Sequence, residues 1–261
     1  MSTWVLLRGL TRDSCHWGAF PGQLRTALPG DVVVTIDLPG NGILNHLDSP
    51  VEVAAMTAHC RAELQRRGVA APVRLLAMSL GAMAAIDWAT RYPEDIECAA
   101  LINTSLRGLS PFYRRLRVAN YAVLLKLVLL RASPQQWERT ILRLTTRHPP
   151  MPNQLLADWT RWRIEHPVSS RNALRQLIAA ARFPAPPQAP RCPVLLMAST
   201  QDGLVDPSCS QTLAAQWHCA IAWHPSAGHD IPLDDSAWVA SEVSKMRGKM
   251  CDKVKIRPGP G

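Results

Sequence analysis

The sequence predicts an α/β fold, in which a mostly parallel sheet of about six strands has helices on both faces. Short apolar runs alternate along the chain with helical patterns. The runs are continuously apolar rather than alternating, which is typical of parallel strands buried on both sides. The chain has 261 residues, 47% hydrophobic and 19% charged, so it can bury a sizeable core without disulfide or metal crosslinks.

Six apolar runs predict the strands, and they cover residues 4–7, 32–36, 73–78, 96–102, 194–197 and 220–223. The second run is rich in β-branched valine, and the first and second both end at glycine-containing turns. Residues 51–67 carry apolar and small side chains at helical spacing, and residues 80–91 are alanine-rich and end before Pro93. Both segments therefore predict helices that connect strands.

The alternation breaks once, between the fourth and fifth strands. About ninety residues there predict helices over 120–130, 134–145, 154–165 and 170–181, followed by a proline-rich extended return over 184–193. We therefore expect an α/β core of residues 1–106 and 191–261, with a helical basic lid and its return over residues 107–190. The apolar run Tyr121 to Leu130 is interpreted as core, with an apolar wall for an acyl chain as the second interpretation.

Composition limits the class of protein. Seven cysteines without a CxxC pair indicate reduced thiols, and no secretory signal or 20-residue apolar stretch is present, so we expect a cytoplasmic protein with no integral membrane segment. His46 and His59 lack neighbours at metal-ligand spacing, and glycine-rich phosphate motifs are missing, so no metal and no cofactor are expected. No nucleic-acid recognition motif occurs. Residues 245–261 are basic, end in Pro-Gly-Pro-Gly and are expected to fray.

Ser79 is the candidate nucleophile. The third strand runs into Ala77-Met78-Ser79-Leu80-Gly81 and then a helix, which is the pattern of a nucleophile elbow. The tight turn strains the serine backbone and leaves room only for small residues two positions away on either side. The helix N-terminus beyond it favours a developing anion. The competing interpretation is that Ser79 only caps this helix.

An acid and a histidine follow in the order that such an elbow requires. Asp202 comes after the fifth strand, and His229 comes after the sixth, beyond His224. Asp206 competes with Asp202, but it precedes Pro207 and is expected to begin the next helix. Asp202 could instead be a turn residue before Gly203, and His229 an ordinary loop histidine. The backbone N–H groups of Leu10, after Arg8-Gly9, and of Leu80 are the candidate oxyanion hole.

These pieces together resemble the α/β-hydrolase fold enzymes, in the branch of small carboxylesterases. The sequence looks most similar to the pimeloyl-acyl-carrier-protein methyl ester esterases of biotin synthesis. The matching segments are Arg8-Gly9-Leu10, Asp37-Leu38-Pro39-Gly40, Ala77 to Gly81, Asp202 to Val205 and Gly228-His229. Two positions depart from the family pattern, since Arg8 replaces a histidine and Ala77 replaces a glycine. The resemblance implies hydrolysis of a small-molecule or carrier-bound ester or thioester by Ser79, His229 and Asp202, without a cofactor.

The positive charge is concentrated in one segment. Residues 107–182 hold 14 Lys and Arg against 3 acids, although the whole chain has a net charge of only +9. Arg139, Arg143 and Arg147 are spaced to share one helix face, where an anionic partner would relieve their repulsion. An acyl carrier protein is the preferred partner, and acyl-CoA, an anionic lipid surface and a merely solvated face are the alternatives. Two other functions stay open, a cofactor-free lyase or perhydrolase on the same scaffold and a non-catalytic binding protein.

Overall fold

A single six-stranded parallel sheet forms the centre of the molecule. The computed structural model describes residues 2–255, and the side chains of residues 2–249. The strands are β1 (Thr3–Leu7), β2 (Val32–Ile36), β3 (Val73–Met78), β4 (Ile96–Ile102), β5 (Val194–Ser199) and β6 (Ala220–His224). They lie in the order β2-β1-β3-β4-β5-β6, and every neighbouring pair is parallel. The predicted fold class is confirmed, and each predicted strand is present.

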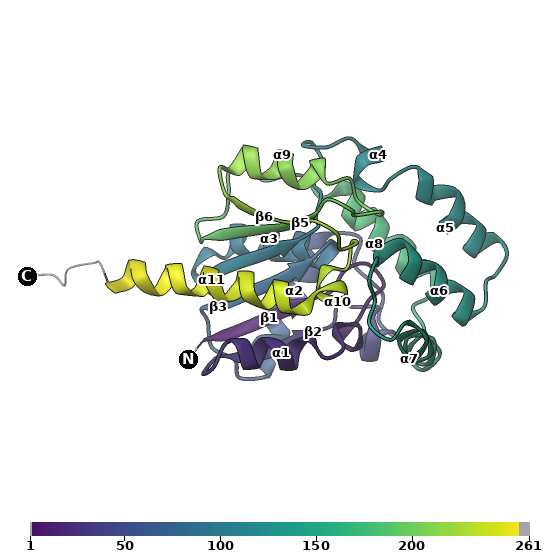
Figure 1. Cartoon of the computed structure of the whole chain (residues 1–261), viewed down its shortest axis with the longest axis horizontal. Coiled ribbons are helices and arrows are strands. Elements are labelled where there is room, and N and C mark those ends of the chain that lie inside the picture. Colours follow the sequence, from purple (N-terminus) through teal and green to yellow (C-terminus); the bar gives the residue numbers. More distant parts are fainter. Residues whose placement is uncertain (1, 256–261) are drawn as a thin grey trace, which may run out of the picture.

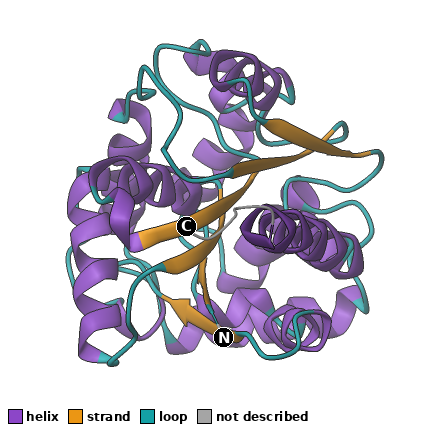
Figure 2. Cartoon of the chain, turned by 90° about the vertical axis from the view of Figure 1, so that its left-hand side faces the viewer, coloured by secondary structure: helices purple, strands orange, loops and turns teal. Residues whose placement is uncertain are grey.

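Helices cover both faces of the sheet, as Figure 2 shows with the sheet between two helical layers. One layer contains α2 (Val53–Arg66), α3 (Leu80–Arg91) and α9 (Ser208–Trp217), which share a buried apolar cluster with the sheet. The other contains α1 (Phe20–Ala27) and α11 (Ser236–Lys255), which pack on a second cluster. Four short helices complete the core, η1 (Ser14–Trp17), η2 (Gly42–Leu44), η3 (Pro93–Asp95) and α10 (Ile231–Asp234).

Five helices separate β4 from β5 in the sequence. They are α4 (Phe112–Arg115), α5 (Ala119–Leu129), α6 (Pro134–Thr145), α7 (Pro152–Glu165) and α8 (Ser170–Arg182). They lie together beyond one end of the sheet (Figure 1). The four helices predicted for this segment correspond to α5 through α8. We call residues 107–190 the helical insertion.

One expectation from the sequence is wrong. Most of the run Tyr121 to Leu130 is solvent-exposed rather than core, since Leu127 is its only buried member. Helix α11 continues to Lys255, and residues 256–261 lie outside the described part of the chain, so the fraying of residues 245–261 stays a prediction. The return over 184–193 contains no helix, as the prolines predicted.

Candidate active site

Parallel strands bring distant loops to one edge of the sheet. The loops that follow β1, β3, β4, β5 and β6 all leave from the carboxyl ends of their strands, the usual ligand-binding edge of an α/β sheet. These loops contain Arg8 to Leu10, Ser79, Asn103, Asp202 and His229 respectively. Ser79, Asp202 and His229, chosen separately from the sequence, therefore lie at one edge of the sheet.

Ser79 occupies a strained turn between β3 and α3. Its φ of 53° and ψ of −118° lie outside the regions that L-residues prefer, which is a cost that functional sites often carry. Two glycines make the turn possible. A Cβ on Gly81 would lie 2.6 Å from the carbonyl oxygen of Leu7, and one on Gly9 would lie 3.1 Å from the Cβ of Ser79. The β1 loop and the serine turn are therefore in direct contact.

Asp202 and His229 form a buried pair. The Nδ1 atom of His229 lies 2.7 Å from Oδ2 of Asp202, and their side chains are only 4% and 2% exposed. The other carboxylate oxygen of Asp202 accepts the backbone N–H groups of Leu204 and Val205, at 2.8 and 2.9 Å. With both oxygens engaged, the carboxylate is held in one orientation. Nδ1 is committed to Asp202, so Nε2 is the imidazole nitrogen left for proton transfer.

The competing residues have other partners. Asp206 accepts the backbone N–H of Ser208, the first residue of α9, and forms an ion pair with Arg117 at 3.4 Å, although the N-cap of α9 is Pro207 and not Asp206 as expected. His224 lies 3.2 Å from Asp235 at the end of β6. Of the candidates Asp202, Asp206, His224 and His229, Asp202 and His229 are the ones that pair with each other.

The loop after β4 connects the serine turn to the histidine loop, a role that the sequence analysis missed. The side-chain amide of Asn103 donates to the carbonyl of His229 at 2.8 Å, and its Oδ1 accepts the backbone N–H of Ser199. The hydroxyl of Thr104 donates to the carbonyl of Ser79 at 3.1 Å. Both side chains are buried. Asn103 and Thr104 therefore fix the backbones that carry Ser79 and His229 relative to each other.

Leu80 is the first residue of α3, and Leu10 follows Gly9, which lies against Ser79. Arg8, the residue that departs from the family pattern, extends its buried side chain to Asp230, directly after His229. The pair is bidentate, at 2.5 and 3.1 Å, and the Arg8 guanidinium also lies over the ring of Trp17. Burial alone would raise the pKa of Asp230, but the charge and hydrogen bonds of Arg8, together with neighbouring positive charge, lower the pKa below its usual value.

The helical insertion is hydrogen bonded to the loops that carry these residues. Asn120, near the start of α5, donates to the carbonyl of Gly203 at 2.9 Å, one residue past Asp202. The carbonyl of Thr145, the last residue of α6, accepts the N–H of Asp230 at 2.8 Å. The side chain of Gln176 on α8 accepts the N–H of Thr11 at 2.8 Å. The insertion is therefore attached beside the site at three separate points.

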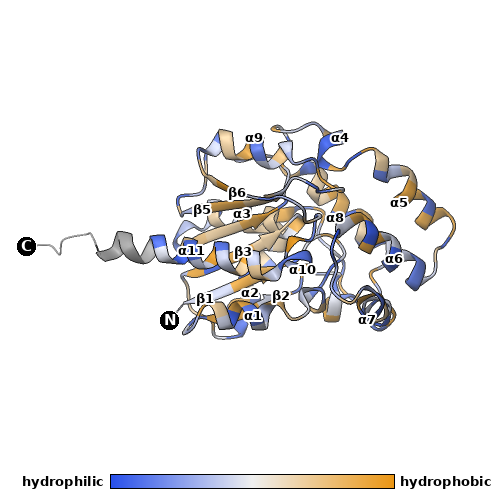
Figure 3. Cartoon of the chain, viewed as in Figure 1, coloured by the Kyte–Doolittle hydropathy of each residue, from blue (hydrophilic) through white to orange (hydrophobic). Residues whose placement is uncertain are grey.

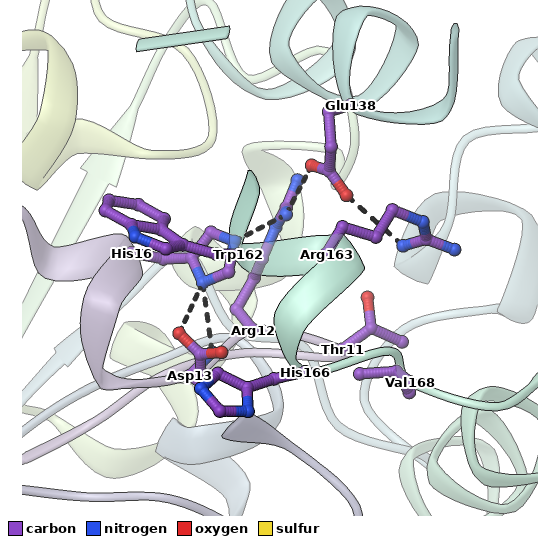
Figure 4. A pocket seen from close by; sticks show the side chains of 9 residues that line it. All are labelled: Thr11, Arg12, Asp13, His16, Glu138, Trp162, Arg163, His166 and Val168. Carbon is purple, nitrogen blue, oxygen red and sulfur yellow. Dashed lines mark hydrogen bonds and ion pairs between the residues drawn. The ribbon is translucent and has the colours of Figure 1, made fainter. Parts of the chain in front are cut away.

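A charged cluster fastens the β1 loop to α6 and α7 (Figure 4). Glu138 is 1% exposed and forms ion pairs with Arg12 at 2.6 Å and Arg163 at 3.2 Å. Arg12 also donates to Nε2 of His16 at 2.8 Å, which requires a neutral imidazole whose Nδ1 faces Asp13 at 2.8 Å. Burial and the charge of Arg12 lower the pKa of His16 and keep it neutral. The cavity among these residues is about 10 Å³, room for about one water, so it is no substrate site.

The basic face predicted on one helix is only partly present. Arg139 and Arg143 are exposed on α6, four residues apart. Arg147 lies beyond the end of α6 at Thr145, and its guanidinium is next to Gly203. The prediction that three arginines share one helix face is therefore wrong for Arg147. The reason is the turn at Thr146, whose φ of −125° and ψ of 158° end the helix.

The cysteines offer no competing nucleophile. The six whose side chains are described are free thiols, and Cys251 lies outside the residues with described side chains. Burial raises the pKa of every one of the six, to about 12 for Cys60. A thiol that stays protonated at neutral pH is a poor nucleophile. Within residues 2–249, no group of three or more His, Cys, Asp or Glu side chains is arranged to hold a metal ion.

Comparison with known proteins agrees with the fold. The chain belongs to the alpha/beta hydrolase family, whose model matches residues 4–242. A search of curated proteins found no match.

Solved structures with the same fold include an esterase from Thermogutta terrifontis (18% identity, TM-score 0.74, covering 95% of this chain and 90% of that one). An enol-lactonase from Burkholderia xenovorans is similar (16% identity, TM-score 0.75, covering 95% of this chain and 91% of that one). BpoC from Mycobacterium tuberculosis, described as a non-heme bromoperoxidase, is also similar (21% identity, TM-score 0.76, covering 95% of this chain and 92% of that one). Family and neighbours together support a hydrolase.

Proposed function

We propose that the protein is a serine hydrolase that cleaves a carboxylic ester or thioester through an acyl-enzyme. The observation that carries the proposal is the strained Ser79 turn at the same sheet edge as the buried Asp202–His229 pair. In this proposal Ser79 is the nucleophile and His229 the general base and acid. Asp202 orients His229, and the N–H groups of Leu10 and Leu80 stabilise the oxyanion.

The reaction then proceeds in two halves. His229 Nε2 takes the hydroxyl proton as Ser79 Oγ attacks the carbonyl carbon, and the negative charge on the carbonyl oxygen is stabilised by the two backbone N–H groups. The tetrahedral intermediate collapses, and the imidazolium gives its proton to the departing alcohol or thiol. Water, deprotonated by His229, then attacks the acyl-enzyme and releases the acid. Asp202 stabilises the imidazolium in both halves.

Active-site labelling tests this proposal. A fluorophosphonate probe should label the wild-type chain, and Ser79→Ala should abolish labelling and lower turnover of p-nitrophenyl esters by about 10⁴-fold or more. Asp202→Asn should lower kcat by about 10³- to 10⁴-fold, whereas Asp206→Asn should leave it within a few-fold. Labelling that survives in Ser79→Ala, or a larger loss in Asp206→Asn than in Asp202→Asn, would overturn the assignment. A chain that never labels would be a binding protein.

We further propose that the acyl group is presented by an anionic carrier such as an acyl carrier protein, as with a pimeloyl-carrier methyl ester. The resemblance to those esterases supports this, and so do exposed Arg139 and Arg143, which form no ion pair among the described residues. Arg139→Glu/Arg143→Glu should raise KM for a carrier-bound ester and leave short soluble esters unaffected. Equal losses on both substrates would indicate damage to α6, and no loss on either would indicate a solvated face.

Perhydrolysis is the second candidate reaction, favoured by the neighbour described as a bromoperoxidase. The acyl-enzyme is the same, but hydrogen peroxide replaces water as the acceptor and a peracid is formed. Product analysis with an ester panel, with and without hydrogen peroxide, separates the two reactions. A cytoplasmic location is part of the proposal, and it is supported by the six free cysteines.

A further inference from the structure

Helix α5 exposes apolar side chains that a helix in water would normally bury. Its 11 residues bury only Asn120 and Leu127, whereas Leu125 and Leu129 are 57% and 70% exposed. Helix α5, most of which is coloured as hydrophobic in Figure 3, lies at the edge of the molecule farthest from the chain termini. We define the α5 surface as the exposed apolar residues on and beside this helix: Val118, Val123, Leu125, Val128, Leu129 and Leu130.

Exposed apolar residues gathered on one helix in this way mark an interaction site. The usual amphipathic pattern is largely reversed, since the buried polar residue Asn120 is an anchor to Gly203 while Leu125, Leu129 and both valines of the helix are exposed. Phe112 on α4 is also exposed, to 70%, and extends the apolar region along the chain. Helix α5 is therefore fixed to the loop of Asp202 at its beginning and presents its apolar residues to an outside partner.

The charges around the α5 surface identify the partner. Residues 107–131 contain six basic residues and no acid. Arg114, Lys126 and Arg131 are exposed among them. An apolar face with basic residues at its border fits the interface of an anionic bilayer, where leucines enter the acyl region and cations meet the headgroups. A second copy of the chain would instead bring two such basic segments against each other, which opposes dimerisation through this face.

We infer that the α5 surface docks the protein onto an anionic lipid surface. At 11 residues, α5 is much shorter than the roughly 20 needed to cross a bilayer, so it lies in the interface. Among residues 2–255, no helix is long and apolar enough to span a membrane. Because α5 is anchored at Gly203, docking places the bilayer beside the candidate active site. The inference concerns binding and stands whether or not the chain is a hydrolase.

Sedimentation with vesicles tests it. Vesicles of ether-linked phosphatidylcholine, with or without one quarter ether-linked phosphatidylglycerol, contain no ester that the protein could cleave. The chain should sediment with the anionic vesicles and much less with the neutral ones, and salt should weaken the binding. Leu125→Gln/Leu129→Gln should lower vesicle affinity at least tenfold. Lys126→Gln/Arg131→Gln should lower it about 25-fold, since each basic residue near the surface contributes about fivefold.

Two matched variants serve as controls. Ile43→Gln/Leu174→Gln removes equally exposed apolar residues elsewhere, and Arg25→Gln/Arg191→Gln removes two exposed cations elsewhere. Both should bind like the wild type, and all variants should keep the wild-type melting temperature and hydrolysis of a soluble ester.

Any of these results would overturn the inference: no sedimentation with either kind of vesicle, α5 variants that bind like the wild type, or control variants that lose as much vesicle affinity as the α5 variants. It would also be overturned if, with no vesicle binding, the α5 variants abolished self-association or binding to an acidic carrier protein.

Discussion

The buried pair of Arg8 and Asp230 should be a strong determinant of both stability and activity. The two side chains are 4% and 3% exposed and meet through two hydrogen bonds, at 2.5 and 3.1 Å. Removing one partner leaves the other buried charge uncompensated. Such losses cost about 3–5 kcal/mol, whereas replacing both partners by apolar residues is often close to neutral. We therefore predict that Asp230→Asn and Arg8→Met each lower the free energy of unfolding by about that amount.

Catalysis should fall as well, because the pair connects the loop of Gly9 and Leu10 to the loop of His229. Arg8 and Asp230 touch no reacting atom in the proposed mechanism, so they act as positioning residues. A displaced His229 or oxyanion loop lowers kcat while KM for a short ester changes little. A purely structural role would lower the yield of folded enzyme without changing kcat per active site, which titration with the fluorophosphonate probe measures.

Urea unfolding of a double-mutant cycle is the assay. Arg8→Met/Asp230→Leu should be within about 2 kcal/mol of the wild type, far from the sum of the single losses. Asp158→Asn, which breaks the exposed pair of Asp158 with Arg161, is the matched control and should cost at most about 1 kcal/mol. Single variants within 1 kcal/mol of the wild type, or a double variant as unstable as that sum, would refute the reasoning.

The pair also predicts a pH dependence. The pKa of Asp230 is lowered in the folded state, so the unfolded chain binds the proton more readily. The stabilisation is complete above the unfolded pKa of about 4 and is lost as pH falls through the folded value. Below pH 4 the wild type should therefore lose stability more steeply than Asp230→Asn, as measured by the urea midpoint. Parallel slopes for the two proteins would contradict the link.

Three further predictions concern other parts of the structure. Gly81→Ala forces a Cβ to 2.6 Å from the carbonyl oxygen of Leu7, so it should lower the free energy of unfolding by more than about 2 kcal/mol and abolish activity. As a control, Gly248→Ala, at an open position on α11, should raise the free energy of unfolding by up to about 1 kcal/mol. Glu138→Gln leaves the buried Arg12 and the half-buried Arg163 without their carboxylate and should speed proteolysis of the helical insertion, with unchanged cleavage as the opposing result. The pKa of His16 is lowered in the folded state, so the free energy of unfolding should fall as pH drops below about 6.5. His16→Gln should weaken this pH dependence, as measured by the urea midpoint between pH 7.5 and 5.5.

Local patterns explain why the sequence predicted the sheet so closely. The strands at 32–36, 73–78 and 96–102 have the predicted bounds, because each is an apolar run closed by a turn, proline or helix signal. Ser79 could be predicted for the same reason, because the strand, the turn with small residues and the helix follow one another directly in the sequence. Asp202 and His229 required one more step, the rule that parallel strands end at one edge.

Ion pairs between residues far apart in the sequence could not be predicted from local patterns. Arg8 and Asp230 are 222 positions apart, and Arg12 and Glu138 are 126 apart, so no local pattern connects them. One signal was present, because an arginine replaced the family's histidine in the oxyanion loop and a buried arginine needs a carboxylate. The aspartate next to His229 is the nearest candidate in the motif. A departure from a family pattern thus indicates a new partner when the substituted residue carries a charge.

The orientation of α5 shows a different limit. A helix that is apolar on nearly every side gives no periodicity, so its composition cannot say which side packs on the fold. Burial was the natural expectation for Tyr121 to Leu130, yet the side chains of Asn120 and Arg117 anchor the helix to Gly203 and Asp206 in the loop of Asp202. Those two polar anchors turn the apolar residues outward. The basic composition of residues 107–131 then gains a physical meaning, because cations beside exposed leucines match an anionic interface better than they match water.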